Sequence, residues 1–218
     1  MKAKLSITRI LAHSEKEKYS LKSKVASKMS ENKTGTPAEF KTNGTITGKG
    51  VVVTEQSSID ALSSRGYGVL EDKIFTLSFY ESLYLLDKGS LEVRDNGLTL
   101  DFQTLLHKSE ENDENAWVNY LVYRDLRSRG YVVREGFGAN IDFRIYERGT
   151  YGKDTAPYLI LIIQEGKPVL VDDLLSAVQQ CQSQKKELIL AVMNRRGEIV
   201  HYSVGELHFP TVSEKQTI

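Results

Sequence analysis

The chain has 218 residues, of which 40% are hydrophobic and 27% are charged, a composition that fits one large globular domain or two small ones. Its 29 Lys and Arg residues balance 29 Asp and Glu residues, so any nucleic-acid contact must come from a local basic patch rather than from net charge. The single cysteine, Cys181, excludes an internal disulfide and a cysteine-rich metal site. No apolar run approaches the roughly 18 residues that a membrane span needs, so we expect a cytoplasmic protein with no membrane contact.

The N-terminal half, residues 1–115, is predicted to form a small α+β domain. Apolar and polar residues alternate over residues 1–12, which predicts an edge strand. Residues 13–50 are rich in Lys, Ser, Asn, Thr and Gly, and we interpret them as a mobile insertion. A β-branched run follows, and then apolar residues at three- and four-residue spacing from Leu77 to Leu85 predict a helix.

The C-terminal half, residues 116–218, is predicted to be a three-layer α/β domain with a mixed central sheet. It opens with an amphipathic helix that ends at Gly130. The pattern then predicts strands at 131–135, 141–147 and 157–165, a helix at 171–186, and strands at 187–194 and 199–207. The strand that begins IVHYSV is aliphatic and β-rich, and it is a candidate to pair edge to edge with a partner chain.

Three segments carry a resemblance to a known family. They are LSFYESLYLLDKGSLEV (77–93), YLVYRDLRSRGYVVREGFGANIDFRIYERG (120–149), and the stretch from TAPYLILII through KKELILAV to HYSV (155–204). In this order they resemble the archaeal tRNA-splicing endonuclease family, over roughly residues 55–207. The resemblance implies a restriction-endonuclease-like C-terminal domain. It also implies an endoribonuclease without metal or other cofactor, which cuts precursor tRNA at bulge–helix–bulge elements and leaves a 2′,3′-cyclic phosphate and a 5′-hydroxyl.

The family's catalytic triad of tyrosine, histidine and lysine maps only in part onto this sequence. The tyrosine at the end of the family's "DFR-aliphatic-Y" strand corresponds to Tyr146. The lysine of its "K-x-L-x-L-A" pattern corresponds to Lys186. The histidine of its "HxxY" pattern corresponds to Thr155 in TAPY, at the family's spacing from Lys186. A threonine has no pKa near neutrality and therefore cannot replace a histidine in proton transfer.

Two further family positions, arginines that hold an RNA base between guanidinium planes, correspond to Gln179 and His201. Glutamine cannot form such a cation–π contact. His201 is interpreted as a strand residue in the arginine's place, with a substitute base as the alternative. The family's assembly loop is acidic, whereas the corresponding residues here are Asn194-Arg195-Arg196-Gly197.

We therefore expect the structural subunit of a hetero-oligomeric tRNA-splicing endonuclease whose partner is a catalytic paralogue. The resemblance implies that the assembly is a tetramer. One alternative is a working endoribonuclease that uses Tyr146, Lys186 and a substitute base. A second is a metal-dependent nuclease, because Asp142, Glu165 and Lys167 follow the D…(D/E)-x-K pattern that can bind a divalent ion and orient a water. A third is an RNA-binding scaffold without enzymatic activity.

Overall fold

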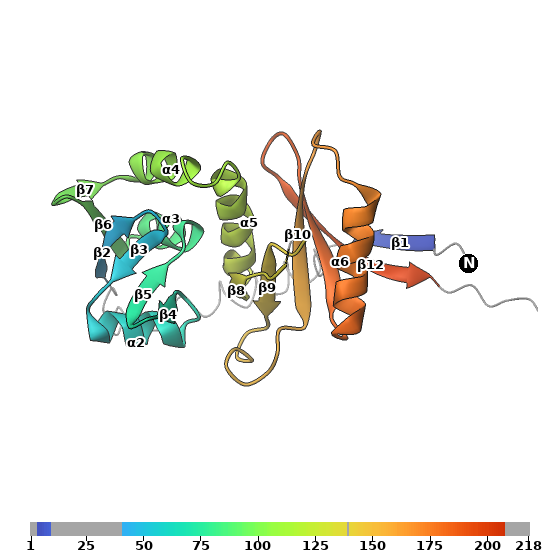
Figure 1. Ribbon diagram of the computed structural model, residues 1–218, viewed down its shortest axis with the longest axis horizontal. Coiled ribbons are helices and arrows are strands. Elements are labelled where there is room, and N and C mark those ends of the chain that lie inside the picture. The colour runs from blue at the N-terminus through green and yellow to red at the C-terminus, as the bar shows by residue number, and fades with distance from the viewer. Residues whose placement is uncertain (1–3, 10–40, 139, 208–218) are drawn as a thin grey trace, which may run out of the picture.

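The computed structural model describes residues 4–9, 41–138 and 140–207. In this part of the chain there are two six-stranded sheets and five helices, and the two sheets lie in opposite halves of the molecule (Figure 1). None of the described helices is both long and apolar enough to cross a membrane. The expected α+β organisation, with mixed sheets in both halves, is confirmed. The division between residues 115 and 116 stays a prediction.

The N-terminal half is a mixed sheet with three helices beside it, in the strand order β4-β5-β3-β2-β6-β7. The only parallel pair in this sheet is β2 with β6. The strands are β2 (Thr42–Thr47), β3 (Gly50–Val53), β4 (Val69–Glu71), β5 (Ile74–Leu77), β6 (Leu91–Asp95) and β7 (Leu98–Leu100). The helices are α2 (Gln56–Ser64), α3 (Phe79–Asp87) and α4 (Phe102–Glu110).

The interpretation of residues 13–50 as a mobile insertion is wrong at its C-terminal end. Residues 13–40 lie outside the described residues, but Thr42–Thr47 forms β2, an interior strand of the sheet. Its buried positions carry small residues, which is why no apolar alternation marks it. A Cβ on Gly44 would lie 2.4 Å from Cγ1 of Val51, so the close packing here requires glycine.

The helix predicted from the spacing of Leu77 to Leu85 is present as α3. Sequence patterns did not identify α2 or α4. Helix α4 begins after Asp101, whose carboxylate accepts a hydrogen bond from the backbone N–H of Thr104 at 2.8 Å. Only Leu105 and Ser109 are buried in this helix, so its apolar face is too narrow to stand out in the sequence.

The C-terminal half has the predicted three layers. Its sheet has the order β1-β12-β11-β10-β9-β8, with β10 and β11 parallel and the other pairs antiparallel. Helix α5 covers one face and helix α6 the other (Figure 1). The bounds are α5 (Ala116–Ser128), β8 (Val132–Glu135), β9 (Phe143–Tyr146), β10 (Tyr158–Gln164), α6 (Val171–Ser183), β11 (Glu187–Met193), β12 (Ile199–Leu207) and β1 (Lys4–Arg9).

The expectation that β12 offers a free edge to a partner chain is wrong for this structure. Strand β1 pairs with β12 along its length, from Lys4 opposite Leu207 to Arg9 opposite Tyr202. The first strand of the chain is therefore an edge strand, as its alternating pattern predicted, but it belongs to the C-terminal sheet and not to the N-terminal half in which we expected it. It pairs with backbone groups that β12 would otherwise present to solvent.

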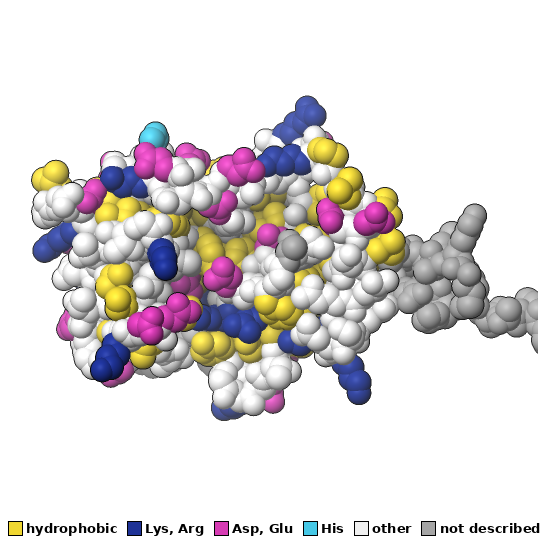
Figure 2. Space-filling model, in the orientation of Figure 1, with side chains coloured by type: hydrophobic (Ala, Val, Ile, Leu, Met, Phe, Trp, Pro, Cys, Tyr) yellow, Lys and Arg dark blue, Asp and Glu magenta, His cyan; other side chains and the backbone are white. Residues whose placement is uncertain are grey.

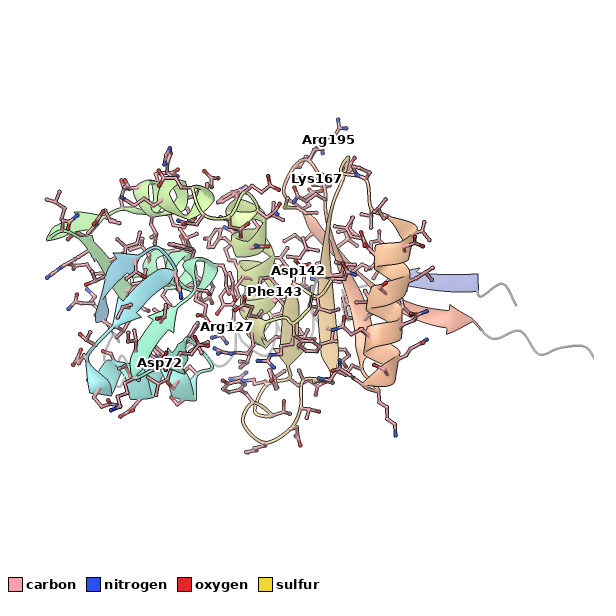
Figure 3. All side chains as sticks on the ribbon, viewed as in Figure 1. Asp72, Arg127, Asp142, Phe143, Lys167 and Arg195 are labelled. Carbon is pink, nitrogen blue, oxygen red and sulfur yellow. The ribbon has the colours of Figure 1, made fainter. Side chains whose placement is uncertain are left out.

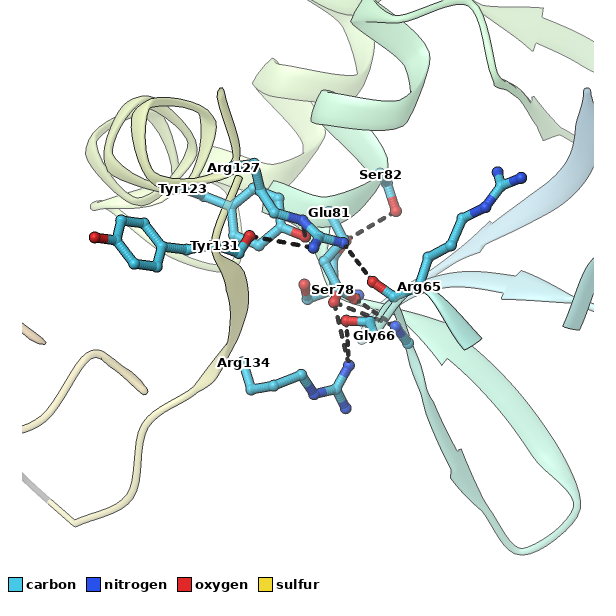
Figure 4. Close-up of polar contacts among 10 residues, drawn as sticks. Arg65, Gly66, Ser78, Glu81, Ser82, Tyr123, Arg127, Tyr131 and Arg134 are labelled. Atoms are coloured by element: carbon cyan, nitrogen blue, oxygen red, sulfur yellow. Dashed lines mark hydrogen bonds and ion pairs between the residues drawn. The ribbon is translucent and has the colours of Figure 1, made fainter. Parts of the chain in front are cut away.

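A buried ion pair joins the two halves (Figure 4). Glu81 of α3 is 4% exposed and accepts hydrogen bonds from the backbone N–H groups of Gly68 and Ser78. Its Oε1 lies 3.5 Å from Nη1 of Arg134 on β8, and the same nitrogen donates to the carbonyl of Gly66 at 3.1 Å. Because a buried carboxylate needs a compensating charge, this contact fixes β8 against the N-terminal half.

A second contact between the halves is a guanidinium–aromatic stack on α5. The Arg127 guanidinium carbon lies 3.8 Å from the centre of the Tyr67 ring, and its Nη2 donates to the carbonyl of Arg65 at 3.1 Å. Helix α5 also contributes Tyr120 and Leu121 to the N-terminal core. It therefore packs against both halves and sets the position of the second sheet relative to the first.

Candidate active site

Three strands bring candidate residues to one end of the C-terminal sheet. Tyr158 at the start of β10 pairs with Ile145 of the antiparallel β9 and with Glu187 of the parallel β11. One residue further along this register, Tyr146 and Lys186 stand at the same level on either side of β10. Their backbones are two strand spacings of about 4.8 Å apart, or about 10 Å in all. At this separation two long side chains can contact the same phosphodiester.

Tyr146 is held by an aromatic contact at the end of β9. Its half-buried ring meets the ring of Tyr151 edge to face, with centroids 5.1 Å apart and an interplanar angle of 87°. The Tyr151 ring in turn lies 3.3 Å from the position that a Cβ on Gly66 would occupy. The loop that carries Tyr151 thus links the end of β9 to the N-terminal half.

Lys186 is the last residue before β11 and follows the end of α6. Its backbone N–H donates to the carbonyl of Cys181 at 2.9 Å, which closes the turn. Its ammonium lies 5.7 Å from the centre of the Phe137 ring, a cation–π contact. No carboxylate among the described residues forms an ion pair with Lys186, so its charge is available at this end of the sheet.

Thr155 is exposed, in the loop two residues before the level shared by Tyr146 and Lys186. Of the two histidines in the described part of the chain, neither lies at this end of the sheet. His107 is on α4 in the N-terminal half, 3.4 Å from Glu111. His201 pairs with Ala191, five residues beyond Lys186 and therefore about 16 Å away along the strand.

His201 also faces the opposite layer. Its strand neighbour Ala191 belongs to the core beneath α5, and its Nε2 lies 3.8 Å from Oδ2 of Asp125 on that helix. The side chain is 12% exposed, and Nε2 is buried with no hydrogen-bond partner among the described residues. This geometry gives no support to His201 as a substitute base for Tyr146 and Lys186.

Burial lowers the pKa of His201 below its usual value; Asp125 opposes this shift and Arg129 adds to it. The unfolded chain takes up a proton near pH 6.5, whereas the folded protein resists it. The free energy of unfolding should therefore fall as the pH drops below about 6.5, with no such effect above it. Urea unfolding at pH 5.5 and 7.5 tests this, because the His201→Asn variant should show a smaller difference between the two pH values than the unmodified protein. Equal differences would contradict the assignment.

The residues of the D…(D/E)-x-K pattern are not gathered into a metal site. Asp142 precedes β9, and its Oδ2 accepts a hydrogen bond of 2.6 Å from the backbone N–H of Ile162, whereas Lys167 and Arg195 lie at the far end of the sheet (Figure 3). Lys167 donates to the side-chain oxygen of Asn115 at 3.2 Å. Within the described ranges there is no group of three or more His, Cys, Asp or Glu side chains placed to hold a metal ion.

On the face of the molecule that Figure 2 shows, positive and negative side chains are mixed. Figure 2 shows Lys and Arg side chains interspersed with Asp and Glu over this face rather than gathered into one broad basic patch. Gln179 is exposed on α6, next to residues whose side chains pack on the sheet. An RNA contact on this face would therefore depend on individual cations rather than on a broad basic patch.

Comparison with known proteins gives one family match in each half of the chain. Residues 116–202 match the family "tRNA intron endonuclease, catalytic C-terminal domain", and residues 42–106 match "tRNA intron endonuclease, N-terminal domain". The chain is 35% identical over 158 residues to a tRNA-splicing endonuclease of Methanococcus maripaludis, covering 72% of this chain and 89% of that protein. This chain belongs to the tRNA-splicing endonuclease family.

A second relative extends the comparison. The tRNA-splicing endonuclease of Pyrococcus furiosus is 32% identical over 160 residues, which cover 73% of this chain and 92% of that protein. The resemblance seen in the sequence motifs is thereby confirmed, and the family is one of endonucleases. The N-terminal domain match begins at residue 42, so strand β1 lies outside both family matches.

One polar residue of the family motif was not singled out from the sequence. Arg144 lies two residues before Tyr146 in IDFRIYE, and strand alternation puts both side chains on the same face of β9. The alternation of side chains along this strand could be predicted from the sequence. The sequence could not show that this guanidinium has no hydrogen-bond or ion-pair partner within residues 41–138 and 140–205.

Proposed function

We propose that this chain is a supporting subunit of a heteromeric tRNA-splicing endonuclease, which excises introns from precursor tRNA at bulge–helix–bulge elements. Its partner is a paralogue with a complete Tyr, His and Lys triad. The assembly holds four subunits, acts in the cytoplasm and needs no cofactor. The proposal follows the family to which the chain belongs, and this chain departs from a fully active member at Thr155, Gln179 and His201.

The main support for the proposal is the set of residues at the end of the sheet where Tyr146 and Lys186 lie. Tyr146 and Lys186 stand at one level of the sheet, while exposed Thr155 occupies the third position and no described imidazole lies nearby. Transesterification by a 2′-hydroxyl requires a base for its proton, an acid at the leaving oxygen and a cation for the charge of the phosphorane. Phenol and ammonium without imidazole supply only part of this set.

The loop after β11 differs from the acidic assembly loop of the family. Arg195 and Arg196 are exposed there, and the backbone N–H of Arg195 donates to Glu165 at 3.3 Å. This chain therefore offers no acidic loop at this position, and in the proposed complex such a loop would have to come from the paralogue.

Reconstitution tests the proposal. The chain, its histidine-containing paralogue and their mixture are each incubated with a precursor tRNA that carries a bulge–helix–bulge intron, in EDTA and in Mg²⁺. We expect cleavage by the mixture in both conditions, products with a 2′,3′-cyclic phosphate and a 5′-hydroxyl, and no cleavage by this chain alone.

The Lys186→Ala variant separates supporting from catalytic roles. In a supporting subunit, this variant should leave the cleavage rate of the complex within about twofold of the unmodified complex. Because Tyr146 and Lys186 do lie at one level, the catalytic alternative predicts instead a loss of about 10²-fold or more. Robust cleavage by the isolated chain, abolished by Lys186→Ala, would overturn the supporting role, and cleavage that requires Mg²⁺ would indicate the metal-dependent alternative.

A further inference from the structure

Arg144 is a half-buried cation with no counter-charge among the residues that the structure describes. Its Nε is inaccessible to solvent and has no hydrogen-bond partner among the described residues. No carboxylate of residues 41–138 or 140–205 lies within the 4.0 Å of an ion pair with its guanidinium. A buried guanidinium nitrogen usually has a hydrogen-bond partner, because taking a polar N–H group out of water without such a partner is costly.

The face of the sheet on which Arg144 lies is the face of the candidate site. Arg144 pairs with Leu159 of β10, which belongs to the core beneath α6. Tyr146 follows two residues later on the same face. Phe137 packs on the same core, and its ring forms the cation–π contact with the Lys186 ammonium. The guanidinium, the phenol and the ammonium therefore belong to one layer at one end of the sheet.

The neighbour of Arg144 on β8 increases the charge imbalance. Arg144 pairs directly with Arg134, and directly paired residues have Cβ atoms about 5 Å apart, an arrangement that is unfavourable for like charges. Glu81 balances Arg134 at 3.5 Å. That carboxylate accepts three donors from the N-terminal half and β8, and it forms no ion pair with Arg144.

Three acidic residues on or beside strands β9 and β11 accept hydrogen bonds from other groups. Glu147 accepts a hydrogen bond of 3.4 Å from the hydroxyl of Tyr158. Glu187 accepts one from the hydroxyl of Ser203, and Asp142 accepts one from the backbone of Ile162. Among the described residues, the guanidinium beside Tyr146 thus has no carboxylate partner, although Asp142 and Glu147 lie two and three positions from Arg144 in the sequence.

We propose that Arg144 is a phosphate-contact residue, which binds a backbone phosphate of the RNA substrate next to Tyr146 and Lys186. A guanidinium forms paired hydrogen bonds with a phosphate, and these are stronger than bonds between neutral groups. The bound phosphate supplies the negative charge that no described carboxylate provides to Arg144. This inference rests on the proposed function, since it names the residue by which this chain holds precursor tRNA.

RNA binding by the unmodified chain, Arg144→Gln and Arg144→Lys tests the proposal. Filter binding of a precursor tRNA at several salt concentrations should show affinity reduced about tenfold to a hundredfold in Arg144→Gln, with partial recovery in Arg144→Lys. The slope of log affinity against log salt should become shallower by roughly 0.7 to 0.9, the value for one lost phosphate contact. Arg94→Gln is the matched control, because Arg94 is an exposed arginine paired with Glu92 in the N-terminal half.

Thermal unfolding provides a readout that does not depend on RNA. In the Arg144→Met variant the unfolding temperature should equal or exceed that of the unmodified protein, because the unbalanced charge is removed. Pyrophosphate should raise the unfolding temperature of the unmodified protein and of Arg94→Gln, but not that of Arg144→Met. A structural arginine would behave in the opposite way, and its removal would lower the unfolding temperature.

The possible outcomes separate this inference from the proposed function. If Arg144→Gln binds precursor tRNA as tightly as Arg94→Gln, or if Arg144→Met unfolds at a clearly lower temperature, the phosphate-contact role is overturned. If Arg144→Gln weakens RNA binding while reconstitution with the paralogue gives no cleavage, the phosphate contact stands and the proposed splicing function fails. Protection by pyrophosphate without any RNA binding would support an anion site and overturn its assignment to RNA.

Discussion

Replacing Thr155 with histidine is expected to raise cleavage by this subunit by about 10²- to 10⁴-fold, the usual contribution of a positioned general acid or base. The position is exposed in the loop that leads into β10, and Tyr146 and Lys186 already stand at one level beside it. An imidazole here would complete a set of base, acid and cation. The measurement is the rate of precursor-tRNA cleavage by the reconstituted complex, with the paralogue's own triad inactivated.

Two control variants make the gain interpretable. Thr155→Gln adds a side chain of comparable length that does not titrate, and it should leave the background rate unchanged. The double variant with Lys186→Ala should lose the gain, because the ammonium would no longer balance the charge of the phosphorane. If Thr155→His cuts no faster than Thr155→Gln, then Thr155 does not occupy the catalytic position.

Replacing Glu81 with alanine is expected to lower the free energy of unfolding by about 3 to 5 kcal/mol, because it leaves the Arg134 charge buried without a partner. The side chains of Arg134 and Glu81 are 12% and 5% exposed. The change also removes the acceptor for the N–H groups of Gly68 and Ser78. Chemical denaturation followed by circular dichroism measures the difference.

The Glu81→Gln variant divides this loss between charge and hydrogen bonding. It keeps a carbonyl oxygen for the backbone donors but removes the negative charge, so it should destabilise the protein less than Glu81→Ala. Burial raises the pKa of Glu81 while Arg134 and the backbone donors oppose this shift. A loss below about 1 kcal/mol for Glu81→Ala would mean that the contact between the halves does not depend on this ion pair.

The strands of the C-terminal half were predictable because each has a strong periodic pattern. PYLILIIQE and ELILAVMN are nearly continuous apolar runs, as expected for central strands covered on both faces, and they form β10 and β11. The N-terminal half was less predictable. Strand β2 buries Thr42 and Gly44 rather than large apolar residues, and the choice of glycine there depends on Val51 of the neighbouring strand.

Local patterns also left open which strand forms the edge of the C-terminal sheet. The sequence identified IVHYSV as a strand with an aliphatic, pairing-prone character, and strands at a free edge share that character. The pairing of β12 with residues 4–9 joins segments nearly 200 residues apart. Pairing between distant segments depends on the whole topology, so it could not be deduced from either segment alone.

By itself, the sequence determined the family, the order of the elements in the C-terminal half and the identity of Tyr146, Lys186 and Thr155 as the positions to compare. It did so because motif residues and strand periodicity are local properties. Only the tertiary structure decided that Tyr146 and Lys186 share a level of the sheet, that His201 lies beneath α5 beside Asp125, and that Arg144 has no counter-charge among the described residues. These depend on register and on what each side chain meets across strands, which the order of residues does not specify.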